Sequence, residues 1–205
     1  MRAQVLIGMS DLFPTQMTLG LREVDIKRRR WRDAKSGEER AQILKGRPIP
    51  VVRWRANRHY LIDRHHLTRA LLDEGVTTLT VEIIDDLRTL DVDEFWDRLQ
   101  KRGWMHPYDD VGDEHEYTAI PLSVRDLIDD PFRSLAGAVR RAGSYAKNIV
   151  PFSEFRWANF FRRRIERAFI ESDFDEAVRV ASVLADSAEA AALPGWLGRG
   201  VHGPA

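Results

Sequence analysis

Apolar residues recur in short runs with strand-like spacing through the first ninety residues, and runs with helical spacing separate them. Strands are predicted at Gln4–Ile7, Pro48–Trp54, His59–Ile62 and Thr77–Ile84. The turn residues 56–58 join the second and third of these strands as a hairpin. Helices are predicted at Glu23–Trp31, Glu38–Leu44 and Leu67–Gly75.

The pattern becomes helical from Asp91 onward. Helices are predicted at Val92–Gln100, Pro121–Ile128, Pro131–Ala142, Phe155–Glu171 and Phe174–Ala192. The sequence thus predicts an α+β domain over residues 1–90 and a mostly helical C-terminal domain over residues 91–205.

The amino-acid composition excludes several kinds of chemistry. The chain has 205 residues, of which 43% are hydrophobic, and it has no cysteine, which excludes disulfides, thiolate metal sites and cysteine nucleophiles. No run of about 18 apolar residues exists and the N-terminal apolar run is too short for a signal peptide, so a cytoplasmic protein without a membrane partner is expected.

Charge is distributed unevenly although the net charge is zero. Residues 1–88 hold 17 Lys and Arg against 12 Asp and Glu, whereas the remainder holds 15 against 20. This asymmetry favours an anionic ligand near the first half; the alternative is a solvated helix face and a strand edge protected by charge.

The segment from Asp63 to Arg69 carries the most chemistry. Asp63 directly follows a strand, and His65 and His66 lie at the start of the next helix, where unpaired N–H groups favour phosphate. Arg64 or Arg69 would add guanidinium donors, and Asp63 would hold a divalent cation or accept a proton. The alternative is structural: Asp63 as an N-cap, and adjacent histidines that point about 100° apart, so that at most one faces a given pocket.

Several motifs, in order, resemble the ParB-like nuclease family of the ParB/sulfiredoxin superfamily. The core motifs are Pro48-Ile49-Pro50-Val51-Val52, Tyr60-Leu61-Ile62-Asp63, His65-His66, Ala70-Leu71 and Gly75. The motifs shared with the family itself are Pro14-Thr15-Gln16, Leu21-Arg22-Glu23-Val24, Asp63-Arg64-His65-His66, Phe95-Trp96, Trp104-Met105-His106-Pro107-Tyr108, Asp130-Pro131-Phe132-Arg133-Ser134-Leu135-Ala136 and Phe155-Arg156-Trp157-Ala158. The resemblance runs from Val5 to about Pro194.

The resemblance implies a ParB/sulfiredoxin-like N-terminal domain that binds a nucleoside triphosphate, such as ATP, with Mg²⁺ at the helix start. Asp63-Arg64-His65-His66 is most similar to the Asp-Gly-His-His segment of free-serine kinases, with Arg64 in place of glycine. The sulfiredoxin cysteine is missing, which excludes that activity.

Site roles follow from this resemblance. The catalytic candidates are Glu23 as the base, Asp63 as the metal ligand, and His65. The candidates for binding nucleotide phosphates are Thr15, Gln16, Arg64, His65, His66 and Arg69. Phosphoryl transfer needs chiefly positioning, charge neutralisation and a base, so nucleotide-dependent phosphotransfer or nucleotide hydrolysis is the first hypothesis.

Two other functions remain open. One is a metal-dependent nuclease, as the family's name suggests; the other is a non-catalytic DNA-binding or partition module. No helix-turn-helix with a basic recognition helix is evident, which disfavours sequence-specific DNA binding. Nucleotide is the expected partner, DNA is the alternative, and a homodimer is left open.

Two features of the second half have two interpretations each. Arg133 and Arg140 lie seven residues apart on one helix face, where they would reach phosphates or pair with acidic residues. The loop from Trp104 to Asp110 would line a pocket or pack at the domain boundary.

Overall fold

The computed structural model describes residues 3–45, 48–55 and 58–198 and divides the chain into two compact units. One unit comprises residues 1–109 and 113–128, and the other comprises residues 110–112 and 129–205. The mixed α/β architecture expected from the sequence is confirmed.

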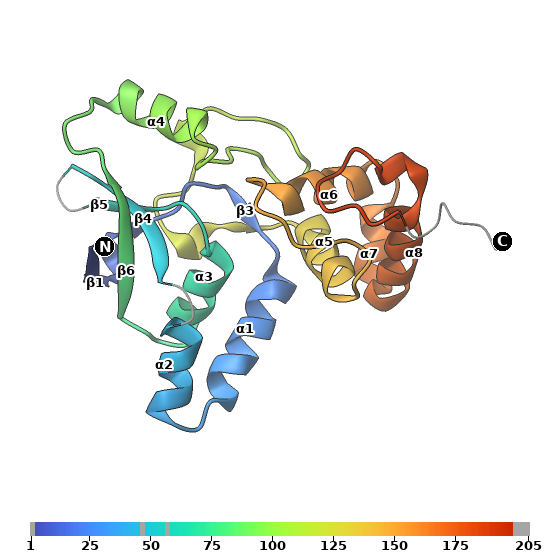
Figure 1. The fold of residues 1–205 in the computed structure, drawn as a ribbon, viewed down its shortest axis with the longest axis horizontal. Helices are drawn as coiled ribbons and strands as arrows, with labels where there is room; N and C mark the ends of the chain where they lie inside the picture. Colours follow the sequence, from blue (N-terminus) through green and yellow to red (C-terminus); the bar gives the residue numbers. More distant parts are fainter. Residues whose placement is uncertain (1–2, 46–47, 56–57, 199–205) are drawn as a thin grey trace. The chain divides into compact units, whose positions relative to one another are not determined.

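A five-stranded mixed sheet forms the centre of the first unit (Figure 1). Its strands, in spatial order, are β1 (Gln4–Gly8), β6 (Thr78–Asp86), β4 (Ile49–Trp54), β5 (Arg58–Leu61) and β2 (Leu12–Phe13). The predicted hairpin is confirmed, because β4 and β5 pair antiparallel. Residues 56 and 57 of its turn lie outside the described residues.

The helices of the first unit are α1 (Leu21–Asp33), α2 (Gly37–Lys45), α3 (His65–Asp73) and α4 (Val92–Lys101). Short strands β3 (Thr18–Leu19) and β7 (Ile128–Asp129) form a separate pair. Period-two alternation along β4 sends Val51 into one apolar cluster and Trp54 into another.

These two clusters lie on opposite faces of the sheet and recruit different helices. The cluster containing Val51 also contains Val24 of α1 and Leu71 of α3. The cluster containing Trp54 also contains Phe95 of α4, whose ring stacks on the Trp54 ring at a centroid distance of 4.4 Å.

Helix α4 explains why the units divide differently from the boundary predicted near Leu90. Its apolar face, including Phe95, Trp96 and Leu99, is buried in the same cluster as Tyr60 of the sheet. Burial of three large side chains against the strands joins α4 to the first unit. The chain passes to the second unit near Ile128.

The second unit contains α5 (Pro131–Arg141), α6 (Ser153–Arg162), α7 (Arg167–Ser172) and α8 (Phe174–Asp186) around one apolar cluster. The single helix predicted over 155–171 is wrong, since the chain breaks between Arg162 and Arg167. Residues five apart on one helix point about 140° apart. The break allows both Ile165 and Ile170 to be buried.

A second prediction is also wrong. Residues 121–128 form a 3₁₀ turn at Val124–Asp126 and then enter β7, rather than forming a helix. The backbone N–H of Ile128 donates to the carbonyl of Met17, so strand pairing replaces helical hydrogen bonding there.

Arg133 and Arg140 of α5 form ion pairs instead of presenting free cations. Arg133 and Arg140 both bind the carboxylate of Glu154 on α6. The spacing of seven residues therefore serves an internal bridge between helices.

No helix among the described residues is long and apolar enough to cross a membrane.

Asp86 at the end of β6 gives the first unit a testable acid dependence. Hydrogen bonds from Arg88 and Arg53 hold the pKa of its carboxyl well below the usual range. A lowered pKa in the folded state contributes stability above about pH 4, which is lost as the pH falls below that value.

Asp86→Asn is expected to shrink the loss of stability between pH 6 and pH 3 by about 1 kcal/mol or less, because the pair is part-exposed. Urea unfolding at both pH values measures the change. Asp97→Asn, at an exposed Lys101 pair, is the control. An unchanged acid dependence in Asp86→Asn would contradict the lowered pKa of the Asp86 carboxyl.

Candidate functional site

The chain turns sharply between strand β5 and helix α3. Arg64 occupies the left-handed region, with φ 67° and ψ 26°, and is the N-cap residue of α3. Asp63 is exposed and is not the N-cap that the structural alternative predicted, since it precedes the observed N-cap, Arg64, by one residue. Its Oδ1 accepts the backbone N–H of Arg64 at 2.6 Å, and no side chain caps the helix.

This turn has the backbone form of an anion site. A residue in the left-handed region followed by helical residues turns successive N–H groups toward one concavity. The partial positive charge of a helix N-terminus adds to their potential. The conformation costs an arginine about 1–2 kcal/mol more than a glycine.

The two adjacent histidines fasten α3 to the segment Thr15–Gly20. His65 Nε2 accepts the backbone N–H of Thr15 at 3.2 Å, and His66 Nε2 accepts that of Gly20 at 3.0 Å. Both rings therefore carry their proton on Nδ1 when neutral. The rings point in different directions, as expected, but reach opposite ends of the same segment.

Thr15 and Gln16 lie in the interior at this junction. Thr15 is 1% exposed and its hydroxyl donates to the carbonyl of Leu61 at 2.5 Å. Gln16 is 6% exposed and its side-chain amide donates to the carbonyl of Thr18. The end of β5 and the start of α3 are thus both bonded to one loop.

Glu23 completes the group from the first turn of α1. This helix begins directly after Gly20, whose N–H is held by His66. Glu23 is 7% exposed, so the structure buries a carboxyl group that an ordinary first-turn position would leave in water. The structure therefore brings Thr15, Gln16, His65, His66 and Glu23 to segments that are bonded to one another.

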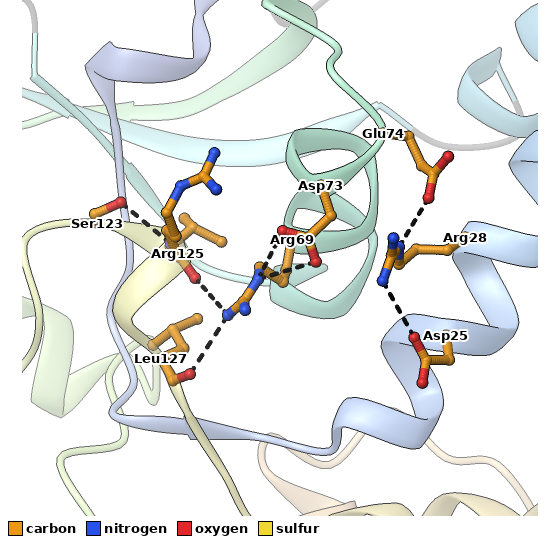
Figure 2. A network of polar contacts seen from close by, with 9 residues as sticks. Asp25, Arg28, Arg69, Asp73, Glu74, Ser123, Arg125 and Leu127 are labelled. Atoms are coloured by element: carbon orange, nitrogen blue, oxygen red, sulfur yellow. Dashed lines mark hydrogen bonds and ion pairs between the residues drawn. The ribbon is translucent and has the colours of Figure 1, made fainter.

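Arg69 has a bracing role that the sequence did not indicate (Figure 2). Its Nε donates to both carboxylate oxygens of Asp73, and Nη1 lies 3.4 Å from the carbonyls of Val124 and Leu127. These hydrogen bonds hold residues 124–127 against α3. These contacts give Arg69 a structural role, and its predicted phosphate contact stays a prediction.

The opposite end of α3 is tied to α1 by a separate bridge (Figure 2). Glu74 accepts a hydrogen bond from Arg28 at 2.8 Å, and Arg28 also reaches Asp25. The positions of α1 and α3 are therefore fixed at both ends, by His66 near their N-terminal ends and by Glu74 near their C-terminal ends.

His106 joins the site although the sequence assigned it no role of its own. Its backbone N–H donates to the carbonyl of Thr15 at 2.8 Å, and it forms a parallel bridge with Gln16. The ring is buried and stacks on Tyr108. The backbone of the loop around His106 is thus bonded to the segment that carries Thr15 and Gln16. In the sequence, His106 stands out only through its position in a shared motif, and the predicted pocket-lining role of this loop stays a prediction.

The site can supply part of the ligand set of a magnesium ion. The parts of the chain that the structure describes contain no group of three or more carboxylates, histidines or cysteines able to hold a metal. Magnesium, however, commonly takes one or two protein carboxylates and fills its other positions with water and substrate phosphates. Asp63 can supply one such ligand, since its Oδ2 makes no hydrogen bond to a described residue.

Comparison with known proteins agrees with this architecture. The family model described as "Putative ParB-like nuclease" matches residues 5–163, so the chain belongs to the ParB-like nuclease family, as its motifs predict. The crystal structure of protein Atu1540 from Agrobacterium tumefaciens is similar, with 44% sequence identity and a TM-score of 0.89. The match covers 96% of this chain and 97% of that chain. A comparison with curated proteins found no match.

Proposed function

We propose that the protein binds a nucleoside triphosphate with Mg²⁺ where α3 begins, and uses it in phosphotransfer or nucleotide hydrolysis. The left-handed Arg64 is the observation that carries this proposal. Backbone strain at a non-glycine residue persists where the surroundings enforce it, and such residues cluster at ligand sites. Here the strain lies at a helix start that no side chain caps.

Phosphate recognition would rest mainly on backbone groups. The first N–H groups of α3 supply donors, and the Arg64 guanidinium supplies a charge-assisted fork. His65 and His66 would act as positioning residues, because their Nε2 atoms already accept N–H groups of Thr15 and Gly20. They hold the loop at a fixed distance from α3.

The reaction needs a metal ligand and a base. Bound Mg²⁺ would neutralise charge on the β- and γ-phosphates. Asp63 would hold the ion, and Glu23 would take the proton from the attacking hydroxyl or water. The attacking oxygen forms a bond to the γ-phosphorus. The bond that breaks joins the γ-phosphorus to the β–γ bridging oxygen, and its electron pair leaves on that oxygen with the nucleoside diphosphate.

Calorimetric titration with ATP, ADP and CTP, with and without Mg²⁺, tests the proposal. Saturable binding that strengthens with Mg²⁺ is expected. Asp63→Asn keeps an acceptor for the Arg64 N–H but loses the charge, so it should lose the effect of Mg²⁺. Asp97→Asn, at an exposed carboxylate of α4, should bind like the unaltered protein. Absence of binding to all three nucleotides would overturn the proposal.

Arg64→Gly is expected to move stability and affinity in opposite directions. Glycine relieves the left-handed strain, less the entropy it adds to the unfolded chain, so stability should rise by about 0.5–1 kcal/mol. Loss of the guanidinium should weaken triphosphate binding about tenfold or more. Urea unfolding and calorimetry measure the two effects; unchanged affinity would remove Arg64 from the phosphate site.

Metal-dependent DNA cleavage is the second candidate, supported by the family and by α1. Arg29 and Arg30 on this helix are exposed and form no ion pair within the described residues. Such cations suit a phosphate backbone. Nicking of plasmid DNA that needs Mg²⁺ and is lost in Asp63→Asn would favour this function. Salt-sensitive DNA binding without nicking would instead favour a non-catalytic DNA-binding module.

A further inference from the structure

Strand β1 forms one edge of the five-stranded sheet and lacks the usual protection against pairing. Its sequence, Gln-Val-Leu-Ile-Gly, contains no charged residue and no proline. The Leu6 side chain is 70% exposed. Natural edge strands usually carry charges, prolines or bulges that block pairing with another chain. Strand β2, at the opposite edge, has only two residues.

The register of β1 shows which of its backbone groups face outward. The Ala3 carbonyl accepts from Ile83 N–H at 3.0 Å, and Met9 N–H donates to the Thr77 carbonyl at 2.9 Å. Antiparallel pairs alternate between hydrogen-bonded and non-hydrogen-bonded positions, so odd-numbered residues face β6. The N–H and C=O groups of Gln4, Leu6 and Gly8 therefore point away from the sheet. The Gly8 carbonyl also accepts the first hydrogen bond of the 3₁₀ turn Met9–Asp11, for which Gly8 is the N-cap, and no described residue pairs with the other five groups.

We propose that this edge pairs antiparallel with β1 of a second copy of the chain, about a two-fold axis at Leu6. The inference does not depend on the proposed nucleotide site. In this register Leu6 faces the partner's Leu6, and Gln4 faces the partner's Gly8. The Leu6–Leu6 pair and the two symmetry-related Gln4–Gly8 pairs each exchange two hydrogen bonds, with the Gly8 carbonyl accepting on its second lone pair. Every outward N–H group of both strands then has a partner.

The side chains are complementary in the same register. Val5 lies opposite the partner's Ile7 on the face of the sheet that carries the Val51 cluster, where both residues are only partly buried. Pairing therefore extends the apolar layer across the axis. On the other face, the two exposed Leu6 side chains meet.

Charge is also compatible with a symmetric pair. Glu82 lies beside Gln4 in the sheet, and Thr78 lies beside Gly8. The pairing places Glu82 at opposite corners of the joined sheets in the two copies, in line with the partner's Thr78. Like charges directly opposite each other would oppose pairing, and this register does not bring any together.

A second copy fits this edge better than an unrelated extended peptide because the strand is self-complementary about its central residue. Two five-residue strands make a small interface compared with the roughly 1,200–2,000 Å² of stable complexes. We therefore expect a dimer that dissociates on dilution.

Sedimentation velocity of the full chain over a concentration series tests the proposal. A monomer–dimer equilibrium is expected, and Leu6→Lys should raise its dissociation constant at least tenfold by setting two lysines opposite each other. The side chain lies on the exposed face, so the fold should be retained. Leu122→Lys is the matched control, because Leu122 is 74% exposed elsewhere in the same unit.

Gly8→Pro gives a second, independent test. Gly8 has φ −65° and ψ 143°, which proline adopts without strain, and its N–H faces outward. The change removes two hydrogen bonds from the dimer and none from the monomer, so dimerisation should weaken. A protein that stays monomeric at every concentration would overturn the proposal, as would a dimer that both variants leave unchanged.

Discussion

Asp130→Ala is expected to cause one of the largest losses of stability in the chain, about 3–5 kcal/mol. Asp130 is 1% exposed and its Oδ2 accepts a hydrogen bond from Arg162 at 2.6 Å. Burial raises the pKa of this carboxyl, and the charge of Arg162 opposes that rise. Removal of the carboxylate leaves a guanidinium that is only 15% exposed without this partner.

The same substitution removes the N-cap of α5, because Asp130 Oδ1 accepts the backbone N–H of Phe132. Urea unfolding of the full chain measures the combined loss of stability from the ion pair and the N-cap. Asp91→Ala separates the two contributions, since Asp91 caps α4 in an exposed capping box with no buried cation. It should lose only about 1 kcal/mol. Equal losses in the two variants would contradict a dominant buried ion pair.

His65→Ala is expected to have the largest effect on the candidate site. The buried N–H of Thr15 loses its acceptor, which costs about 1–3 kcal/mol. The loop Thr15–Gly20 is then held to α3 chiefly by His66, so nucleotide binding should weaken at least tenfold. Thermal unfolding and calorimetry measure the two effects.

His115→Ala is the matched control for this substitution. Its ring is 41% exposed and pairs with Asp109 at 2.8 Å. Stability and nucleotide binding should both change little, because an exposed pair contributes little. A His65→Ala protein that binds nucleotide as tightly as the His115→Ala protein would show that the loop's attachment does not support the site.

Local patterns predicted the four longer strands, β1, β4, β5 and β6, because period-two alternation and turn residues act over a few positions, but they missed the two-residue strands β2, β3 and β7. They failed where distant packing decides. The attachment of α4 to the sheet depends on Trp54 and Tyr60 meeting Phe95, and no local pattern carries that information. The break near Arg164 likewise follows from the burial of Ile165.

The candidate site was also predicted only in part, because some of its contacts join residues far apart in the sequence. Motif order brought out Thr15, Gln16, Glu23, His65 and His66, and the structure places them on bonded segments. The part played by the His106 backbone could not be predicted, since it depends on a hydrogen bond to a residue 91 positions earlier in the chain. The bracing role of Arg69 required the position of residues 124–127.

Hydrogen–deuterium exchange with and without ATP and Mg²⁺ shows where on the chain the nucleotide binds. Slower exchange is expected in residues 15–23 and 63–68 on addition of ATP and Mg²⁺, with little change in residues 129–198. Protection confined to residues 129–198, or no protection at saturating ATP, would contradict a nucleotide site at the start of α3.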